Sequence, residues 1–141
     1  MKPLKFPAFR QDGSKIMLSE ILDQIPQNNW TWSIWEFDGI GKPPFGLSMT
    51  EFNQVALSRG VLMTWQEVKL FAYSLLDIHF CLLIATIQEK QLTIKEVEKE
   101  NFENYDMVIY AFDSTEWKVW SHNKNILNLI RTKVSEPRKN E

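Results

Sequence analysis

The chain of 141 residues has little of several features that mark particular classes of protein. Its one cysteine, Cys81, cannot form an internal disulfide, so stability has to come from a packed core. Its longest apolar stretch, around residues 80–87, is too short to cross a bilayer. The amino-terminal segment MKPLKFPAFRQDG has two prolines and no apolar run, unlike a secretory signal. We therefore predict a cytoplasmic protein that does not associate with membranes.

The chain also lacks an excess of basic residues. The sequence has sixteen lysines and arginines and eighteen acidic residues, which gives a formal net charge of −2. Proteins that bind nucleic acid by displacing counterions are normally basic, so we predict no nucleic-acid partner. A mildly acidic surface suits a basic protein partner, because complementary charge accelerates association.

Motifs for metal binding and catalysis are missing as well. The histidines, His79 and His122, stand outside any recognised zinc-binding spacing. The glycine-containing segment 37–46 is not a phosphate-binding loop, because two prolines follow its lysine and supply no N–H donors. His79 lies two residues from Cys81, but the apolar neighbours of the cysteine favour a core role over a nucleophile. The sequence predicts no metal, no other cofactor and no catalytic residue.

Three capping boxes are present, each with a hydroxyl residue three positions before a glutamate. They are Ser48 with Glu51, Thr64 with Glu67, and Thr93 with Glu96. In such a box, the hydroxyl and the carboxylate bind backbone N–H groups that the first helical turn leaves unpaired. The boxes predict helices over about 48–59, 64–77 and 94–102, and apolar spacing predicts two more over about 17–25 and 123–134.

Four strands fill the gaps between these helices, over residues 30–37, 79–87, 106–112 and 116–121. The second and third are apolar on both faces, which is typical of strands in the middle of a sheet. The fourth alternates between apolar and polar residues, so we predict an outer strand that forms an antiparallel hairpin with the third through a turn at 113–115.

These elements predict an α+β fold in a single domain over residues 1–134, followed by a flexible tail at 135–141. The domain would hold a central sheet of about four mainly antiparallel strands, with about five helices packed against it.

The stretch WTWSIWEFD, residues 30–38, holds three of the six tryptophans. Strand alternation places Trp30, Trp32, Ile34, Glu36 and Asp38 on one face and Trp35 and Phe37 on the other. The first three of these residues would form core. Two explanations fit the second face. Either helices cover both faces of the sheet, or one face stays partly open as a recognition surface.

On the second explanation, the sequence predicts a non-catalytic module that binds a basic protein through an acidic and aromatic surface. The candidate partner-binding residues are Trp35, Glu36, Phe37, Asp38, Glu116 and Trp120. The segment FDSTEWKVWSHNKNILNLI, residues 112–130, resembles in type the small cytosolic immunity proteins of bacteria, which inhibit a toxin through such a face.

The alternative is a small-molecule-binding protein or an enzyme, with a tryptophan-lined pocket between the sheet and the helices. Its candidate polar groups are His79, Cys81, Glu36 and Asp113. A homodimer formed through an exposed sheet face or edge is compatible with either function.

Overall fold

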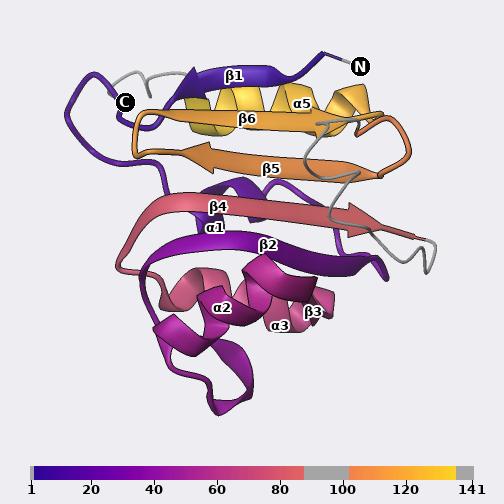
Figure 1. The fold of residues 1–141 in the computed structure, drawn as a ribbon. Coiled ribbons are helices and arrows are strands. Elements are labelled where there is room, and N and C mark those ends of the chain that lie inside the picture. The colour runs from indigo at the N-terminus through magenta and orange to yellow at the C-terminus, as the bar shows by residue number, and fades with distance from the viewer. Residues whose placement is uncertain (1, 88–101, 136–141) are drawn as a thin grey trace.

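The computed structural model describes residues 2–87 and 102–135 (Figure 1). Its strands are β1 (Leu4–Pro7), β2 (Thr31–Ile40), β3 (Val61–Met63), β4 (Asp77–Thr86), β5 (Met107–Phe112) and β6 (Glu116–Ser121). Its α-helices are α1 (Leu18–Leu22), α2 (Met49–Arg59), α3 (Trp65–Ser74) and α5 (Lys124–Ile130), with a 3₁₀ turn at Pro44–Gly46 and a π-helical turn at Arg131–Ser135. The helix predicted over 94–102 lies outside the described residues except for its last residue, and so does the tail after residue 135.

The strands form one antiparallel sheet in the order β1-β6-β5-β4-β2-β3. The α+β class is confirmed, but the described residues contain six strands and four α-helices instead of about four and about five. The central places of β4 and β5 and the β5–β6 hairpin are as predicted. The prediction that β6 is an outer strand is wrong, because β1 pairs with its free side.

Local sequence explains where the helices begin. Ser48 Oγ accepts a hydrogen bond from Glu51 N at 3.1 Å, and Glu51 Oε1 accepts one from Ser48 N at 3.0 Å. Thr64 and Glu67 form the same reciprocal pair at 3.2 and 2.9 Å. Such caps typically contribute about 1 kcal/mol each. Both predicted capping boxes within the described residues are confirmed.

One face of the sheet, the helical face, carries the main core. Helices α1, α3 and α5 pack on this face, and α1 and α5 lie behind the sheet in Figure 1. Its largest fully buried side chains include Trp32, Ile34, Leu83 and Trp117. Full burial of one such aliphatic side chain contributes roughly 1.5–3 kcal/mol. The core assignment of Trp32 and Ile34 is confirmed, and Trp30 packs partly buried against the same cluster.

A β-bulge in β2 changes which way its later residues point. Ile34 pairs with Leu83, and Glu36 pairs with Leu82. Trp35 is therefore an extra residue of β2 that has no pairing residue on β4. Phe37 therefore turns to the helical face, where it is 1% exposed and its ring centroid lies 5.0 Å from that of Phe71. The prediction that Phe37 shares a face with Trp35 is wrong for this reason. Glu36 and Asp38 likewise point away from the face of Trp32 and Ile34, contrary to the alternation.

The opposite face, the outer face, carries a smaller cluster of buried side chains. Its buried members are Trp35, Leu82, Ile84, Phe102, Tyr105, Val108 and Trp120. Phe102 packs edge-on against Trp120, with ring centroids 4.9 Å apart. The residues before β5 thus cover one half of the outer face, which we call the covered half.

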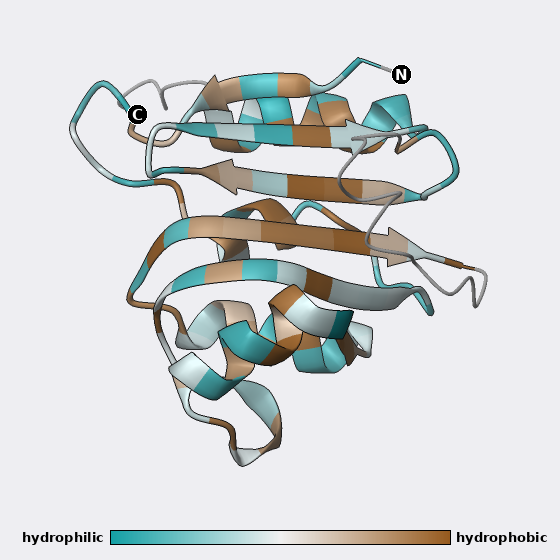
Figure 2. Cartoon of the chain, in the orientation of Figure 1, coloured by the Kyte–Doolittle hydropathy of each residue, from teal (hydrophilic) through white to brown (hydrophobic). Residues whose placement is uncertain are grey.

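The hydrophobic residues concentrate along β4 and β5, the two central strands, as Figure 2 shows. This distribution matches their burial on both faces. Among the described residues, no helix has both the length and the apolar character needed to cross a membrane.

Candidate functional site

The other half of the outer face, which we call the open half, brings together side chains from β2, β4, β5 and β6. The sheet register aligns Glu36, Leu82, Tyr110 and Lys118 in one row across the strands. A second row contains Asp38, Phe80, Phe112 and Glu116. Residues paired in this way point to the same face of a sheet.

Three aromatic rings form the centre of the open half. Phe80 and Phe112 pack edge to face with ring centroids 5.7 Å apart, and Tyr110 stacks on Phe112 at 6.1 Å. Phe112 is 47% exposed, and the other two rings are half-buried. Aromatic side chains suit a binding surface because they bury much area with few rotatable bonds.

Carboxylates border these rings on the β2 side. Glu36 is half-buried, and among the described residues its carboxylate has no hydrogen-bond or ion-pair partner. Burial raises the pKa of Glu36 above its usual value, because desolvation disfavours the charged form. Asp38, on the same strand, is exposed. A cation placed beside Glu36 would offset this desolvation penalty.

The structure brings only three of the six predicted partner-binding residues onto this accessible surface. They are Glu36, Asp38 and Glu116. Trp120 is 8% exposed beneath Phe102. Phe37 lies on the helical face.

Trp35 is 7% exposed, and its indole N–H donates to Ser33 Oγ at 3.0 Å. Gly60, which ends α2, lies against the indole: a Cβ at this position would be 2.9 Å from Trp35 Cε2. Trp35 therefore meets the end of a helix, which answers the question that alternation left open.

Sequence reasoning missed the aromatic residues of this surface, the exposed Phe112 and the half-buried Phe80 and Tyr110. Each lies in a strand that is apolar on both faces, and the sequence pattern alone does not show which part of a sheet face stays uncovered. The pairing of β4 with β5, which aligns their residues in rows, would have been the useful signal.

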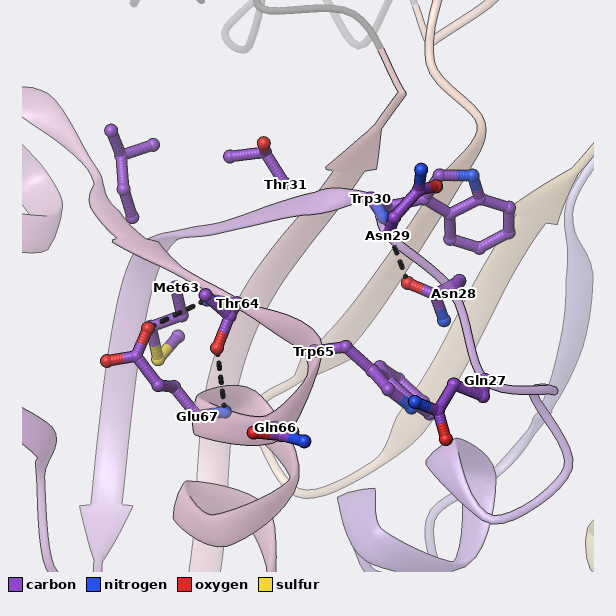
Figure 3. A pocket seen from close by; sticks show the side chains of 11 residues that line it. Gln27, Asn28, Asn29, Trp30, Thr31, Met63, Thr64, Trp65, Gln66 and Glu67 are labelled. Atoms are coloured by element: carbon purple, nitrogen blue, oxygen red, sulfur yellow. Dashed lines mark hydrogen bonds between the residues drawn. The ribbon is translucent and has the colours of Figure 1, made fainter.

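A second concave feature lies between the start of β2 and the start of α3 (Figure 3). This open groove has a volume of about 550 Å³ and is lined by residues 27–31 and 62–67. Its polar lining is mostly uncharged, with amide side chains from Gln27, Asn28, Asn29 and Gln66. Asn28 Oδ1 accepts hydrogen bonds from Trp30 N and from the Trp32 indole N–H.

The groove offers few free ring faces for a ligand. Trp65 packs against Trp32, with ring centroids 5.3 Å apart, and the ammonium of Lys69 lies 5.3 Å from the Trp65 ring centroid. Trp30 is the more accessible ring of the groove lining.

The four polar groups predicted for an enzyme or small-molecule site do not converge. Cys81 is buried on the helical face, and its burial raises the pKa of the thiol well above its usual value. The His79 imidazole contacts Ser114 and Asp77 instead of the cysteine. Asp113 is exposed in the β5–β6 turn. Across residues 2–87 and 102–135, no three side chains of the metal-ligating types gather closely enough to hold an ion.

In comparisons with known proteins, the chain matches no protein-family model, and no curated protein or solved structure is significantly similar to it.

Proposed function

We propose that this protein is a binding module for a basic protein partner, and that the open half of the outer face is its contact surface. The observation that carries the proposal is the half-buried carboxylate of Glu36, which has no partner among the described residues and borders exposed aromatic rings. A lysine or arginine of the partner would pair with this carboxylate, and apolar groups beside it would cover Phe112.

The charges of the surface support a partner with a cationic side chain next to an apolar one. Glu36 and Asp38 lie on β2, on one side of the rings, whereas Lys118 and Glu116 lie on β6, on the other side. The two β6 charges offset each other, so the net negative charge lies on the β2 side of the aromatic centre. An arginine also stacks well on aromatic faces, which the exposed rings would permit.

An immunity-type inhibitor of a bacterial cell is one specific form of this proposal. It rests on the acidic and aromatic character of the surface and on the sequence resemblance of residues 112–130. A toxin encoded beside this chain would be the first partner to examine.

The test is affinity capture from a lysate of the producing organism, followed by calorimetric titration of each captured protein after purification. We expect a basic partner whose affinity falls at least tenfold, about 1.4 kcal/mol, in Phe112→Ser and in Glu36→Lys. The affinity should also fall at high salt, because charge pairs at the rim are screened.

Leu70→Ser is the matched control. Leu70 is 74% exposed on α3, so its replacement removes a similar apolar surface away from the proposed contact. The proposal fails if Phe112→Ser and Glu36→Lys bind as tightly as the wild type, or if Leu70→Ser weakens binding equally. Trp35→Ala is unsuitable because it would open a cavity in the covered half.

The second candidate function is the binding of a small uncharged molecule in the groove of Figure 3. It is favoured by the amide side chains around the accessible Trp30 ring. Titration of intrinsic fluorescence with neutral sugars, in the wild type and in Trp30→Phe, would test it. No saturable change in the wild type would remove this candidate.

A further inference from the structure

Four polar side chains from separate parts of the chain form a closed ring of contacts at the end of the sheet where β4 begins. We call it the polar ring. It consists of Lys15, Asp77, His79 and Ser114. Lys15 precedes α1, the next two residues lie in β4, and Ser114 lies in the β5–β6 turn.

A single assignment of donors and acceptors accounts for the distances in the polar ring. Lys15 Nζ donates to Asp77 Oδ1 at 2.7 Å and to Ser114 Oγ at 3.1 Å. Ser114 Oγ lies 2.6 Å from His79 Nδ1, and His79 Nε2 lies 3.4 Å from Asp77 Oδ2. A neutral imidazole with its proton on Nε2 satisfies both contacts, because Nδ1 then accepts the hydroxyl proton of Ser114.

The backbone at Ser114 is a second, independent observation. Asp113 and Ser114 have φ values of 49° and 56°, the left-handed region that two-residue hairpin turns require. Glycine is preferred at the second position, because a side chain in the left-handed region is strained. The sequence places a hydroxyl in this strained position, and the hydroxyl contacts both a base and a cation.

We infer that Ser114 is an activated nucleophile, with His79 as its general base, and that it accepts acyl groups from small carboxylic esters. This inference concerns a different surface from the proposed partner-binding site and does not depend on it. The two proposals can therefore fail separately.

The reaction would follow the usual course of serine acyl transfer. Ser114 Oγ attacks the ester carbonyl carbon while its proton passes to His79 Nδ1. The C–O bond to the alcohol then breaks, and the alkoxide leaves with that proton as an alcohol. Water then attacks the acyl carbon while His79 takes one of its protons. The C–O bond to Ser114 breaks, His79 returns that proton to Ser114 Oγ, and the carboxylic acid leaves.

The other two members of the polar ring have distinct roles in this scheme. The ammonium of Lys15 lies beside Ser114 Oγ, so it would also face the carbonyl oxygen of a bound ester, where the negative charge develops during the attack. Asp77 is a positioning residue, because it accepts a hydrogen bond from the lysine and its other oxygen lies 3.4 Å from His79 Nε2. The hydrogen bond from Lys15, chiefly, lowers the pKa of Asp77, so this carboxylate stays ionised in neutral solution.

The exposure of the site fits a small ester. The His79 side chain is 42% exposed and Ser114 is partly exposed, so a substrate can reach both from solvent. Phe9 is also exposed, and its ring centroid lies 5.4 Å from Lys15 Nζ. This ring offers an apolar surface for the aryl or alkyl group of the ester.

The test is labelling of the purified full chain with a fluorophosphonate probe, with the modified residue located by mass spectrometry, beside a measurement of p-nitrophenyl acetate hydrolysis. We expect the label on Ser114, and we expect His79→Gln to slow labelling about 100-fold, the usual contribution of a general base. Ser114→Gly should lose the label and the ester hydrolysis but keep the fold, since glycine adopts the positive φ without strain.

Thr115→Val is the matched control, because it removes the neighbouring hydroxyl of the same turn, which donates only to the Phe112 carbonyl. It should label and hydrolyse like the wild type. The inference is overturned if Ser114 reacts no faster than the exposed Ser58, if His79→Gln labels at the wild-type rate, or if Ser114→Gly hydrolyses the ester normally.

Discussion

The helical face and the outer face belong to the same six strands, yet they differ in how far other segments cover them. Leu83 and Ile84, neighbours in β4, are both 0% exposed. Leu83 packs into the large cluster, which includes residues of all four α-helices, whereas Ile84 belongs to the small cluster with Phe102 and Tyr105. Ile84 pairs with Val108 of β5. Further along β5, on the same side of the sheet, Phe112 is exposed.

This difference separates residues that build the protein from residues available to a partner. The helical face is closed by α1, α3 and α5, so changes there act on stability. The residues that the structure describes close only half of the outer face, and the open half carries aromatic rings beside a carboxylate to which those residues offer no partner. Changes in the open half should therefore act on binding much more than on stability.

The largest expected effect distinguishes the two buried clusters. Leu83→Ala should lower the free energy of unfolding by about 3 kcal/mol, and Ile84→Ala by about 2 kcal/mol. The smaller cluster can relax around the missing atoms more readily, so Ile84→Ala should lower the free energy of unfolding by less. Urea denaturation of both variants measures the difference. A greater loss for Ile84→Ala would reverse the ranking of the two faces.

A smaller effect tests how Trp35 is covered. Gly60→Ala should cost roughly 2 kcal/mol, because φ is +77° and the new Cβ would press on the Trp35 ring. Gly13→Ala is the control, since its φ is +87° but open space surrounds it, so it should cost only about 1 kcal/mol. Thermal denaturation gives both values. Equal losses would show that Gly60 does not pack on Trp35.

Phe112→Ser should change stability by less than about 1 kcal/mol, because the ring is half exposed and loses only its contacts with Phe80 and Tyr110. Denaturant unfolding measures this change. A loss as large as that of Leu83→Ala would mean that the open half is a structural part of the core.

The smallest effect is the pH dependence of Glu36. Burial raises its pKa in the folded state, so the ionised carboxylate opposes folding at neutral pH. Glu36→Gln should therefore stabilise the protein by less than about 1 kcal/mol at pH 7, since the carboxylate is only partly buried and water still screens it. As pH falls through the folded pKa of Glu36 and below its unfolded value, the wild type regains this stability and the two proteins should converge. Denaturation across a range of pH measures both stabilities. A difference between the wild type and Glu36→Gln that grows in acid would contradict the raised pKa of Glu36.

Much of the fold could be predicted from local chemistry. The capping boxes at Ser48 and Thr64 located two helix starts, and apolar content on both faces identified β4 and β5 as central. β1 was missed because its prolines resemble a loop, although an edge strand tolerates them. β3 was missed because it is only three residues long and lies directly between the end of α2 and the next cap.

The candidate site was less predictable because it depends on contacts between distant segments. Alternation failed at Phe37, since a bulge at Trp35 shifts the later residues of β2 by one position. The burial of Trp120 depends on Phe102, eighteen residues earlier in the chain. His79 seemed to point to Cys81 by spacing, but the fold places it against Ser114 of another strand connection.

The most direct measurement is hydroxyl-radical footprinting of the protein, free and bound to its captured partner. We predict that Phe80, Tyr110 and Phe112 lose reactivity on binding, while the exposed Tyr73 of α3 keeps its own. Protection of Tyr73, or of residues in the tryptophan groove, with Phe112 equally reactive in both states would contradict the assignment of the open half as the partner surface.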